Sequence, residues 1–590
     1  MAQSQPTEAH RIESDNDQDR EGTPSTPQTI PLAQDPASKP VTPLPKMSLA
    51  IVFLVRIAEP INFTFILPFI NSYVWDLNVT RDRSRVGIYA GIIESLFAVS
   101  QLFTVLHWAS LSDRIGRRPV LIVGTIGLTI SAVLFGLAET FAMAIFARCL
   151  TGLLNGNVAL LRSIVGEVCD ETNLAKGFVL LPLAWNAGAS IGPLLGGFLV
   201  SPATRFPDSF GNKDAPFYFG GLWARKPYLL PCLAVAFISF ISFLVLAAFL
   251  PETLPSKVAE LKERERRKAA REAGEDEEGQ TTGVIVEEEP NLRKRGGQRV
   301  AGRAGDEDDE QTPLLASQRP TNGHTTTEPS TLTDPEENSS SWSILRIPHV
   351  RNVLLSFGVF SFCSVGIEAV MVLFFYEPLH LGGLHFSPAQ TGTYLGFFAA
   401  FSMVVQTFAT PYLVRKLGTN RLYWYCLLCF PFMALSLPLA NVVARWGSGG
   451  HVGGEADPLP TSTMVWVYII LSIFGVLRCC SAFGYACNLL LVNECARLMP
   501  GSHLGAVNGF STMASSIARS LSPAFCTLLF SLTVSPDTIP LFRGWLVWGG
   551  LFTCGALATH SAEALKPIEV AVVEEEARRE MVRRERAQSD

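Results

Sequence analysis

Charged side chains are scarce in this chain and make up only 17% of its 590 residues. They gather in residues 1–46, 256–337 and 566–590, so that the long segments between these stretches are mostly apolar. A soluble protein of this length usually divides into several domains that carry more charge. No basic patch with interleaved aromatics and no nucleic-acid-binding motif is present, so we expect no nucleic-acid partner.

Other absences exclude further classes. The acidic, proline-rich N-terminus lacks the features of a cleavable signal peptide, so the first apolar helix must direct membrane insertion. No nucleophile–base pair, phosphate-binding loop or metal site is evident, and we therefore expect no enzymatic activity, no catalytic residue and no cofactor. Cys426 and Cys429 have the spacing of a metal pair, but no second pair or histidine accompanies them, which favours a structural role.

What the sequence does contain is a series of apolar runs of about 20 residues or more, each long enough to cross a hydrocarbon core. They predict an all-α membrane protein with about twelve transmembrane helices in two six-helix bundles, at 47–250 and 346–565. The expected spans are 48–73, 86–110, 119–138, 141–163, 178–200, 228–250, 350–376, 389–413, 422–444, 465–490, 506–533 and 542–560.

The remaining segments are polar. Residues 1–46 are predicted to be a disordered cytosolic N-terminus, and 566–590 a cytosolic tail. The linker 251–345 is predicted to be largely disordered, apart from helix formers at 257–273 that we expect along the cytosolic surface. Within it, Glu310, Leu314 and Leu315 have the form of an acidic dileucine sorting signal for an adaptor. This leaves a vacuolar or lysosome-like membrane and the plasma membrane as alternatives.

The two halves show internal similarity. Arg148 precedes Pro193 by 45 residues, and Arg478 precedes Pro523 by the same interval. Repeated halves place a substrate site at their interface in many secondary transporters. Most basic loop residues lie on one side if both termini are cytosolic, which also places the glycosylation sequon at Asn78 outside.

The strongest motif is the loop from Trp108 to Pro119, in which Gly116 permits a turn and Asp113 can pair with nearby arginines. This string, with Asp113, Gly116, Arg117 and Arg118, resembles the signature loop of the major facilitator superfamily. The resemblance implies that Asp113 latches the two bundles together on the cytosolic side. The counterpart beginning at Arg415 lacks the aspartate, so an asymmetric latch is expected.

A second motif lies in the fifth expected span. Glycines four residues apart share one helix face, where they let another backbone approach, and proline permits a bend. The string containing Gly188, Gly192, Pro193, Gly196 and Gly197 resembles the antiporter motif of the drug:proton antiporter branch. Strings around Arg56, Asn157 and Gly188 are similar to the zinc-induced facilitator-like group and its fungal multidrug-resistance relatives. No histidine-rich loop supports zinc itself as cargo.

Charges inside the expected spans are the best guide to mechanism, because each costs roughly 2.5–3.5 kcal/mol in a bilayer unless it faces a partner or a cavity. The resemblance ties Arg148 to proton transfer. We hypothesise that Glu59 binds a proton and faces Arg148, with Glu368 as a second proton or cation site. Alternatively, Arg56 and Glu59, three residues apart, neutralise each other. The candidate charges inside the spans are Arg56, Glu59, Glu94, Arg148, Glu368, Arg478 and Arg519.

Several amides lie in the same spans and are candidates for a substrate cavity: Asn62, Asn157, Asn186, Gln406 and Asn488. Helix–helix hydrogen bonding is the alternative role for each. Taken together, the sequence predicts proton-coupled antiport of a small organic solute or metal chelate by alternating access. Its expected partners are the lipid bilayer, that solute and protons. An uncoupled facilitator of the same fold and a transporter-like sensor remain alternatives.

Overall fold

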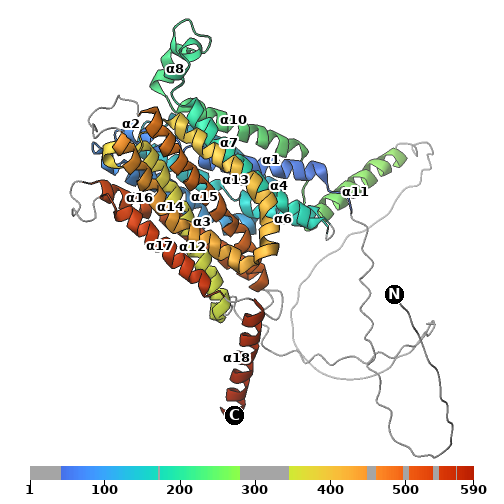
Figure 1. The fold of residues 1–590 in the computed structure, drawn as a ribbon. Coiled ribbons are helices and arrows are strands. Elements are labelled where there is room, and N and C mark those ends of the chain that lie inside the picture. The colour runs from blue at the N-terminus through green and yellow to red at the C-terminus, as the bar shows by residue number, and fades with distance from the viewer. Residues whose placement is uncertain are drawn as a thin grey trace, which may run out of the picture.

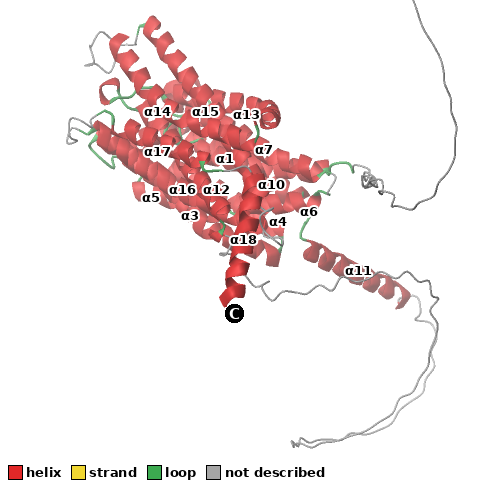
Figure 2. Ribbon diagram, turned by 60° about the horizontal axis from the view of Figure 1, so that its bottom comes forward, coloured by secondary structure: helices red, strands yellow, loops and turns green. Residues whose placement is uncertain are grey.

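The computed structural model describes residues 42–170, 173–278, 345–447, 460–495, 504–535, 544–565 and 568–589. Within these ranges the regular elements are all helices, which Figure 2 draws in red, with green loops between them. Ten of the described helices are long and apolar enough to cross a membrane. The predicted all-α membrane class is confirmed, and the sorting signal at Glu310, Leu314 and Leu315 lies outside the described residues.

The first half is a bundle of long helices with a small knob of short helical turns between α7 and α10. Its helices are α1 (Lys46–Thr64), α2 (Ile70–Asp76), α3 (Val86–Ile115), α4 (Arg117–Leu137), α5 (Phe141–Leu154), α6 (Asn157–Val168), α7 (Leu174–Leu199), α8 (Pro202–Arg205), α9 (Leu222–Arg225) and α10 (Leu229–Phe249), with the short turns η1 (Arg83–Arg85), η2 (Pro207–Gly211) and η3 (Phe219–Gly221).

The second half consists of long helices, and a charged helix follows each half. The second-half elements are α12 (Pro348–Tyr376), η5 (Leu379–Leu381), α13 (Pro388–Leu417), α14 (Thr419–Gly447), α15 (Thr461–Cys495), α16 (Leu504–Val534) and α17 (Leu546–Glu563). The charged helices are α11 (Pro255–Glu278) and α18 (Ile568–Ser589). In Figure 1 α11 points away from the helical body, and its expected place along the cytosolic surface stays a prediction.

Two expected spans are broken rather than continuous. The first divides into α1 and α2 around Pro68, which has no N–H to continue the helical ladder. The fourth divides into α5 and α6 at Asn155 and Gly156, so neither piece is long enough to count as a span. The twelfth, α17, has 18 residues and includes His560 and Glu563, which make its last turn polar. Because α1 alone still counts as a span, the break in the fourth span and the polar end of the twelfth account for the difference between ten long apolar helices and twelve expected spans.

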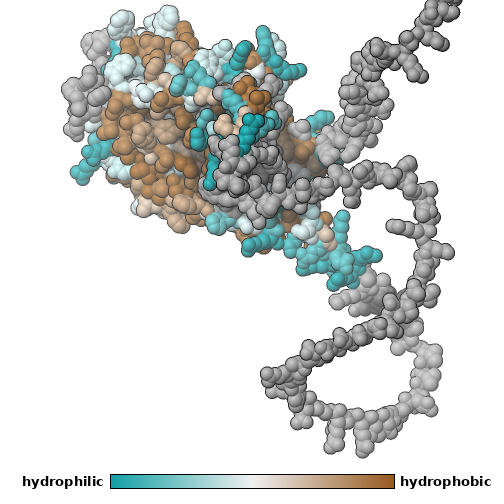
Figure 3. Space-filling model, turned by 90° about the horizontal axis from the view of Figure 1, so that it is seen from below, coloured by the Kyte–Doolittle hydropathy of each residue, from teal (hydrophilic) through white to brown (hydrophobic). Residues whose placement is uncertain are grey.

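We call the end where α3 meets α4 the inner end, and the end with α2 and α8 the outer end (Figure 1). Large apolar side chains lie exposed on the flanks between them, with Phe103 69% and Phe408 77% exposed. Figure 3 shows brown apolar side chains over the body of one face, with teal hydrophilic ones at its margins. Apolar surface of this kind is stable in lipid and not in water.

The two halves meet in the outer part of the molecule. One buried core cluster contains Val74 and Ile93 of the first half together with Val370 and Phe374 of the second. A separate core cluster near the inner end draws its buried members from the first half alone, among them Leu49 and Leu160. The halves therefore share a core toward the outer end, and the inner part of the first half has a core of its own.

Candidate functional site

Hydrogen bonds between the halves follow the same pattern. Near the outer end, Asn71 Nδ2 of α2 donates to the carbonyl of Val372 in α12 over 3.4 Å. In the outer part of α16, the backbone N–H of Ala524 donates to Ser95 Oγ of α3 over 3.0 Å. Between α7 and α13, Ser190 Oγ donates to the carbonyl of Gly396 over 2.8 Å.

An arginine also spans the outer contact. The Arg83 guanidinium lies 5.7 Å from the ring centroid of Trp75 in its own half and 5.5 Å from that of Tyr376 in the other. The next residue, Glu377, is only 1% exposed, and its Oε2 has no hydrogen-bond partner among the described residues. Burial raises the pKa of the Glu377 carboxyl to about 8, although the nearby Arg83 opposes this shift.

Deeper in the first half, Glu59 is buried and forms an ion pair with Arg56, one helical turn away on α1. Its other oxygen accepts a hydrogen bond from Asn155 Nδ2 over 3.2 Å. Asn155 stands at the break between α5 and α6, and this break brings its amide to the carboxylate. The arrangement matches the alternative in which Arg56 and Glu59 neutralise each other.

Arg148 of α5 is 3% exposed and has no ion pair within the described part of the chain. Its Nη1 donates to the backbone carbonyl of Asn62 over 3.3 Å, and its guanidinium lies over the rings of Phe97 and Phe135. In this structure Arg148 does not form an ion pair with Glu59, whose carboxylate is bound by Arg56 on the same helix. The proton-coupling role of Glu59 and Arg148 stays a prediction.

In the second half, Glu368 of α12 forms a 2.8 Å ion pair with Arg478 of α15. The two side chains are 27% and 25% exposed, so the pair is partly accessible to water. Ser364 Oγ lies 3.4 Å from Arg478 Nη1 and accepts a hydrogen bond from the Tyr485 hydroxyl over 3.3 Å. The second half thus holds its arginine against a carboxylate, unlike the first.

Glu94 of α3 completes this polar cluster. It is half-buried and makes no hydrogen bond or ion pair with a described residue. The charges that act on it come from Arg148 in its own half and Glu368 in the other, so it links the two sites electrostatically. The sequence marks Glu94 as a charge within a span, but without the fold nothing set it apart from the other carboxylates.

The five candidate cavity amides divide into two groups. Asn62, Asn157 and Asn488 are buried between helices, and Asn62 Nδ2 donates to Ser239 Oγ over 2.7 Å while Asn488 Nδ2 lies 3.5 Å from Ser511 Oγ. Asn186 and Gln406 are half-buried. The contacts of Asn62 and Asn488 fit helix–helix packing, whereas neither amide atom of the buried Asn157 has a hydrogen-bond partner among the described residues. A substrate-binding role for all five stays a prediction.

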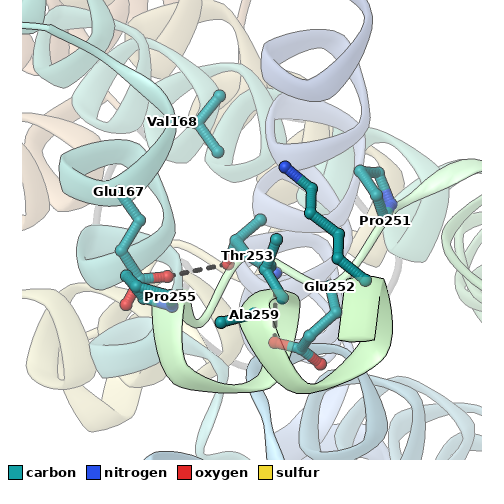
Figure 4. Close-up of a pocket in the computed structure, with 9 residues that line it drawn as sticks. Glu167, Val168, Pro251, Glu252, Thr253, Pro255 and Ala259 are labelled. Atoms are coloured by element: carbon teal, nitrogen blue, oxygen red, sulfur yellow. Dashed lines mark hydrogen bonds between the residues drawn. The ribbon is translucent and has the colours of Figure 1, made fainter. Parts of the chain in front are cut away.

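The signature loop forms an ion network at the inner end. Arg117 Nη1 lies 2.6 Å from Asp113, and Arg117 Nη2 lies 2.9 Å from Glu167 of α6. Thr253, after α10, donates to the other Glu167 oxygen over 2.7 Å, as Figure 4 shows. An open pocket of about 490 Å³ beside Glu167 and Thr253 is lined entirely by the first half and α11. In this structure Asp113 therefore binds within its own half, and its predicted latch to the second half remains a prediction.

Glu252 caps the start of α4. Its two carboxylate oxygens accept from the backbone N–H groups of Arg117 and Arg118, over 2.8 and 3.2 Å. This satisfies free amides at a helix N-terminus and places negative charge where the helix dipole favours it. Gly116 has φ 109°, and a Cβ there would lie 2.4 Å from Glu252 Oε2, so both the backbone and the carboxylate require glycine.

The glycines of α7 also act as spacing residues. A Cβ on Gly188, Gly192 or Gly196 would collide with α1 and the turn after it, at Pro60, Thr64 and Phe65. Gly197 instead faces α13 of the second half, where a Cβ would lie 2.5 Å from the Pro388 carbonyl oxygen. One motif therefore packs the first half internally and against the second half. Its expected role in antiport, together with Pro193, stays a prediction.

Comparison with known proteins agrees with this architecture. The sequence profile of the Major Facilitator Superfamily matches residues 52–523 of the chain. The chain belongs to the major facilitator superfamily. It is an integral, multi-pass membrane transporter, and its relatives include one named a multidrug transporter and one named a zinc-induced facilitator.

Three relatives show the extent of the similarity. The major facilitator-type transporter psiT2 of Psilocybe cyanescens is 29% identical over 517 residues, which cover 86% of this chain and 88% of that protein. The multidrug transporter mfsB of Aspergillus fumigatus is 27% identical over 508 residues, covering 82% and 79%. Protein ZINC INDUCED FACILITATOR 1 of Arabidopsis thaliana is 24% identical over 487 residues, covering 82% and 84%.

Solved structures of the superfamily share the fold. A D-xylose–proton symporter superposes with a TM-score of 0.56 at 12% identity, covering 89% of this chain and 99% of the other. A bacterial homologue of the lysosomal transporter Spinster gives 0.52 at 13% identity, covering 91% and 96%. At such identities the likeness concerns the fold alone.

The structure adds residues that the sequence did not single out in this major facilitator fold. Asn155 lies in the centre of the first half, Glu377 lies at the outer end, and the inner end holds Glu167, Glu252 and Thr253. Glu167 and Glu252 lie within a few residues of span ends, where acidic residues suggest caps and ion pairs. Asn155 adjoins Gly156, which signals a helix break. Glu377 gives no signal in the sequence, since its burial depends on contact with the other half.

Proposed function

We propose that this major facilitator transporter exports or sequesters a small organic solute, or a metal chelate, in exchange for protons. The observation that carries the proposal is the polar cluster of Glu94, Glu368, Arg148 and Arg478 from both halves, together with the buried pair of Glu59 and Arg56 in the first half. Holding these charges inside a membrane costs free energy, and Arg148 has no carboxylate partner in the described chain. A carboxylate that takes up a proton becomes neutral. It can then separate from its arginine partner without leaving an unpaired carboxylate charge inside the membrane.

In the proposed cycle the two halves rock about the polar cluster by alternating access. The hydrogen bonds between the halves at Asn71, Ser95 and Ser190 support a state in which the outer end is closed. Opening the outer end must break these contacts, while Asp113 and its network would engage the second half at the inner end. Glu59, Glu94 and Glu368 would exchange protons as their access to water alternates.

The names of relatives support the direction and the kind of cargo. One is called a multidrug transporter, and an Aspergillus niger relative, 27% identical over 520 residues, is called an efflux pump. Together with the antiporter-like motif of α7, these names favour outward movement of organic solutes from the cytosol. The destination is the cell exterior or the lumen of a vacuole.

The test uses purified protein in liposomes with an imposed pH difference and a screen of radiolabelled organic solutes. We expect solute flux that follows the proton gradient and disappears when an ionophore collapses it. Glu59→Gln, Glu94→Gln and Glu368→Gln should each weaken this coupling, whereas Glu263→Gln on the surface of α11 serves as the matched control. Flux that ignores the gradient would favour the uncoupled facilitator, and no flux of any solute would favour the sensor.

A further inference from the structure

Three arginines gather between the halves, on the inner side of the polar cluster. Arg56 comes from α1, Arg162 from α6 and Arg519 from α16, so both halves contribute. Their positive charges repel one another: Arg162 is repelled by Arg56 and Arg519, and Arg519 is also repelled by Arg56. The fourth expected span contains Arg162, but nothing in the sequence places it beside the other two.

Negative charge near these arginines is insufficient to balance them. Glu59 acts on both Arg162 and Arg519, but its carboxylate is already occupied by Arg56 and by the amide of Asn155. Three positive charges therefore face one negative charge. At this depth repulsion between like charges is stronger than in water, because the effective dielectric constant is lower.

Two of the three guanidinium groups have unused hydrogen-bonding capacity. Arg162 is exposed, and it makes no hydrogen bond or ion pair with any described residue. Arg519 donates from Nη2 to Ser516 Oγ on its own helix over 3.3 Å, while its Nε is enclosed without a partner in the described chain. Guanidinium groups bind carboxylate, sulfonate and phosphate oxygens through several N–H donors at once.

Aromatic side chains from both halves flank the arginines. The Arg56 guanidinium lies 5.0 Å from the ring centroid of Trp185, whose ring centroid is 6.4 Å from that of Phe63. On the other side, Tyr485 acts electrostatically on Arg519 and has its ring centroid 4.8 Å from that of Phe360. A flat apolar body bound at the arginines would meet ring surface on either side.

We propose that Arg56, Arg162 and Arg519 bind the anionic group of an aromatic organic anion, which is the transported solute. This inference rests on the proposed transport function and specifies its substrate class. The anion supplies the missing negative charge, and because it contacts arginines of both halves it removes the repulsion between Arg162 and Arg519. Binding therefore favours closure of the inner end around the solute, which is the step that alternating access requires.

A lipid headgroup phosphate carries the same chemistry and could reach the arginines from the membrane. The test therefore uses two kinds of vesicle, one of phosphatidylcholine alone and one that also contains phosphatidylglycerol. Naphthalenesulfonate serves as the anionic probe, and naphthylmethylammonium, with the same ring system, serves as the cationic probe. Binding of both is measured on reconstituted wild type, Arg162→Gln, Arg519→Gln and the matched control Arg264→Gln on the surface of α11.

We expect the dissociation constant of naphthalenesulfonate to rise about tenfold or more in each of Arg162→Gln and Arg519→Gln, and to stay unchanged in Arg264→Gln. The cationic probe should bind weakly to the wild type and no less well to the variants. Because each substitution relieves repulsion, the thermal unfolding midpoint of the ligand-free variants should equal or exceed that of the wild type. Arginines with a purely structural role would lower the midpoint instead.

Three results would overturn the inference. The first is stronger binding of naphthylmethylammonium than of naphthalenesulfonate, and the second is unchanged naphthalenesulfonate binding in both variants. The third is loss of naphthalenesulfonate binding whenever phosphatidylglycerol is present, because the site would then belong to a lipid headgroup. Failure of the transport proposal looks different: the arginine-dependent binding persists, but no solute moves under a pH difference.

Discussion

The turn after α3 holds Gly116 at φ 109° and ψ 160°, and the corresponding turn after α13 holds Gly418 at φ 79° and ψ 157°. The backbone is nearly the same, but the surroundings differ. A Cβ on Gly116 would strike the Glu252 carboxylate, whereas nothing lies within 4 Å of a Cβ on Gly418. In the first half this turn belongs to an ion network in which Glu252 caps α4. In the second half the turn at Gly418 has the same backbone but no such contact.

The central arginines differ in the opposite sense. Arg148 and Arg478 stand 45 residues before Pro193 and Pro523. Arg478 binds Glu368, but Arg148 binds a backbone carbonyl and two ring faces. The comparison teaches that the repeat conserves the position of a side chain and not its partner. Each half therefore carries a different part of the proposed mechanism.

A third contrast lies where α2 and α12 end at the outer side. Asp76 is exposed and accepts a hydrogen bond from the Tyr228 hydroxyl, whereas Glu377 is buried with one oxygen unpartnered. The charged groups that act on Glu377 are Arg83 and Asp82 of the first half, and the adjacent Tyr376 hydroxyl also interacts with it electrostatically. The outer contact between the halves thus contains a carboxyl group that responds to pH.

The largest effect is expected from this carboxyl group. Because its pKa is raised to about 8, the folded protein keeps a proton that the unfolded chain releases above about pH 4.5. Stability is thus greatest below that pH and falls as the pH rises toward 8, by at most about 1.4 kcal/mol per pH unit. Thermal unfolding in detergent from pH 5 to 8 should show the decline, and Glu377→Gln should flatten it.

Asp76→Asn is the matched control for this experiment, since it alters the exposed carboxylate and leaves Glu377 in place. It should retain the decline in unfolding temperature between pH 5 and 8. An unaltered slope in Glu377→Gln would show that the buried carboxyl group at the outer contact does not control the pH response.

The two turn glycines offer the next largest difference. Gly116→Ala should destabilise the protein by about 3 kcal/mol, because it adds backbone strain and displaces the Glu252 cap. Gly418→Ala should cost only the strain, about 1 kcal/mol. Unfolding temperatures of the two variants, measured side by side, test the contrast. Equal losses would mean that the contact with Glu252 contributes nothing.

The ion pair of the second half comes next. Glu368→Gln leaves Arg478 without a carboxylate and should cost about 2 kcal/mol, less than for a fully buried pair because both side chains are partly exposed. The double variant Glu368→Gln/Arg478→Gln should recover much of that loss. A double-mutant cycle on unfolding temperature measures the coupling, and strictly additive losses would argue against the pair.

The smallest effect concerns the network of the first half. Thr253→Val removes the hydrogen bond to Glu167 while keeping the side-chain shape, and should cost about 1 kcal/mol. The unfolding temperature is again the measurement, with Thr410→Val on α13 as a control, because its hydroxyl bonds only to its own helix. A similar loss in both variants would show that the network at Glu167 is not specific.

Much of this fold follows from its sequence because apolar length is a direct measure of membrane crossing. The glycine spacing in α7 likewise specifies a close helix contact, which the structure shows against α1. Helix breaks were missed because Pro68 and Gly156 stand within otherwise apolar runs, and proline and glycine also occur inside continuous helices such as α7.

The partners of charged residues were harder to predict. Arg56 lies one turn from Glu59, so local spacing alone anticipates their pairing. The buried Arg148, the bridging position of Glu94 and the burial of Glu377 all depend on contacts between segments far apart in the chain. The sequence shows which residues are charged and roughly how deep each lies within its expected span. It does not show which side of a helix faces which neighbour, because that depends on how the helices pack in the bundle.

Spin-label distances test the central claim, that the two halves rock about a polar centre, most directly. One pair of labels is placed on exposed outer residues, Arg81 and His380, and another on exposed inner residues, Arg114 and Arg415, after native cysteines that react with the label have been replaced. Raising the pH from 5 to 8 should lengthen the outer distance and shorten the inner one. Two distances that stay fixed, or change in the same direction, would contradict alternating access.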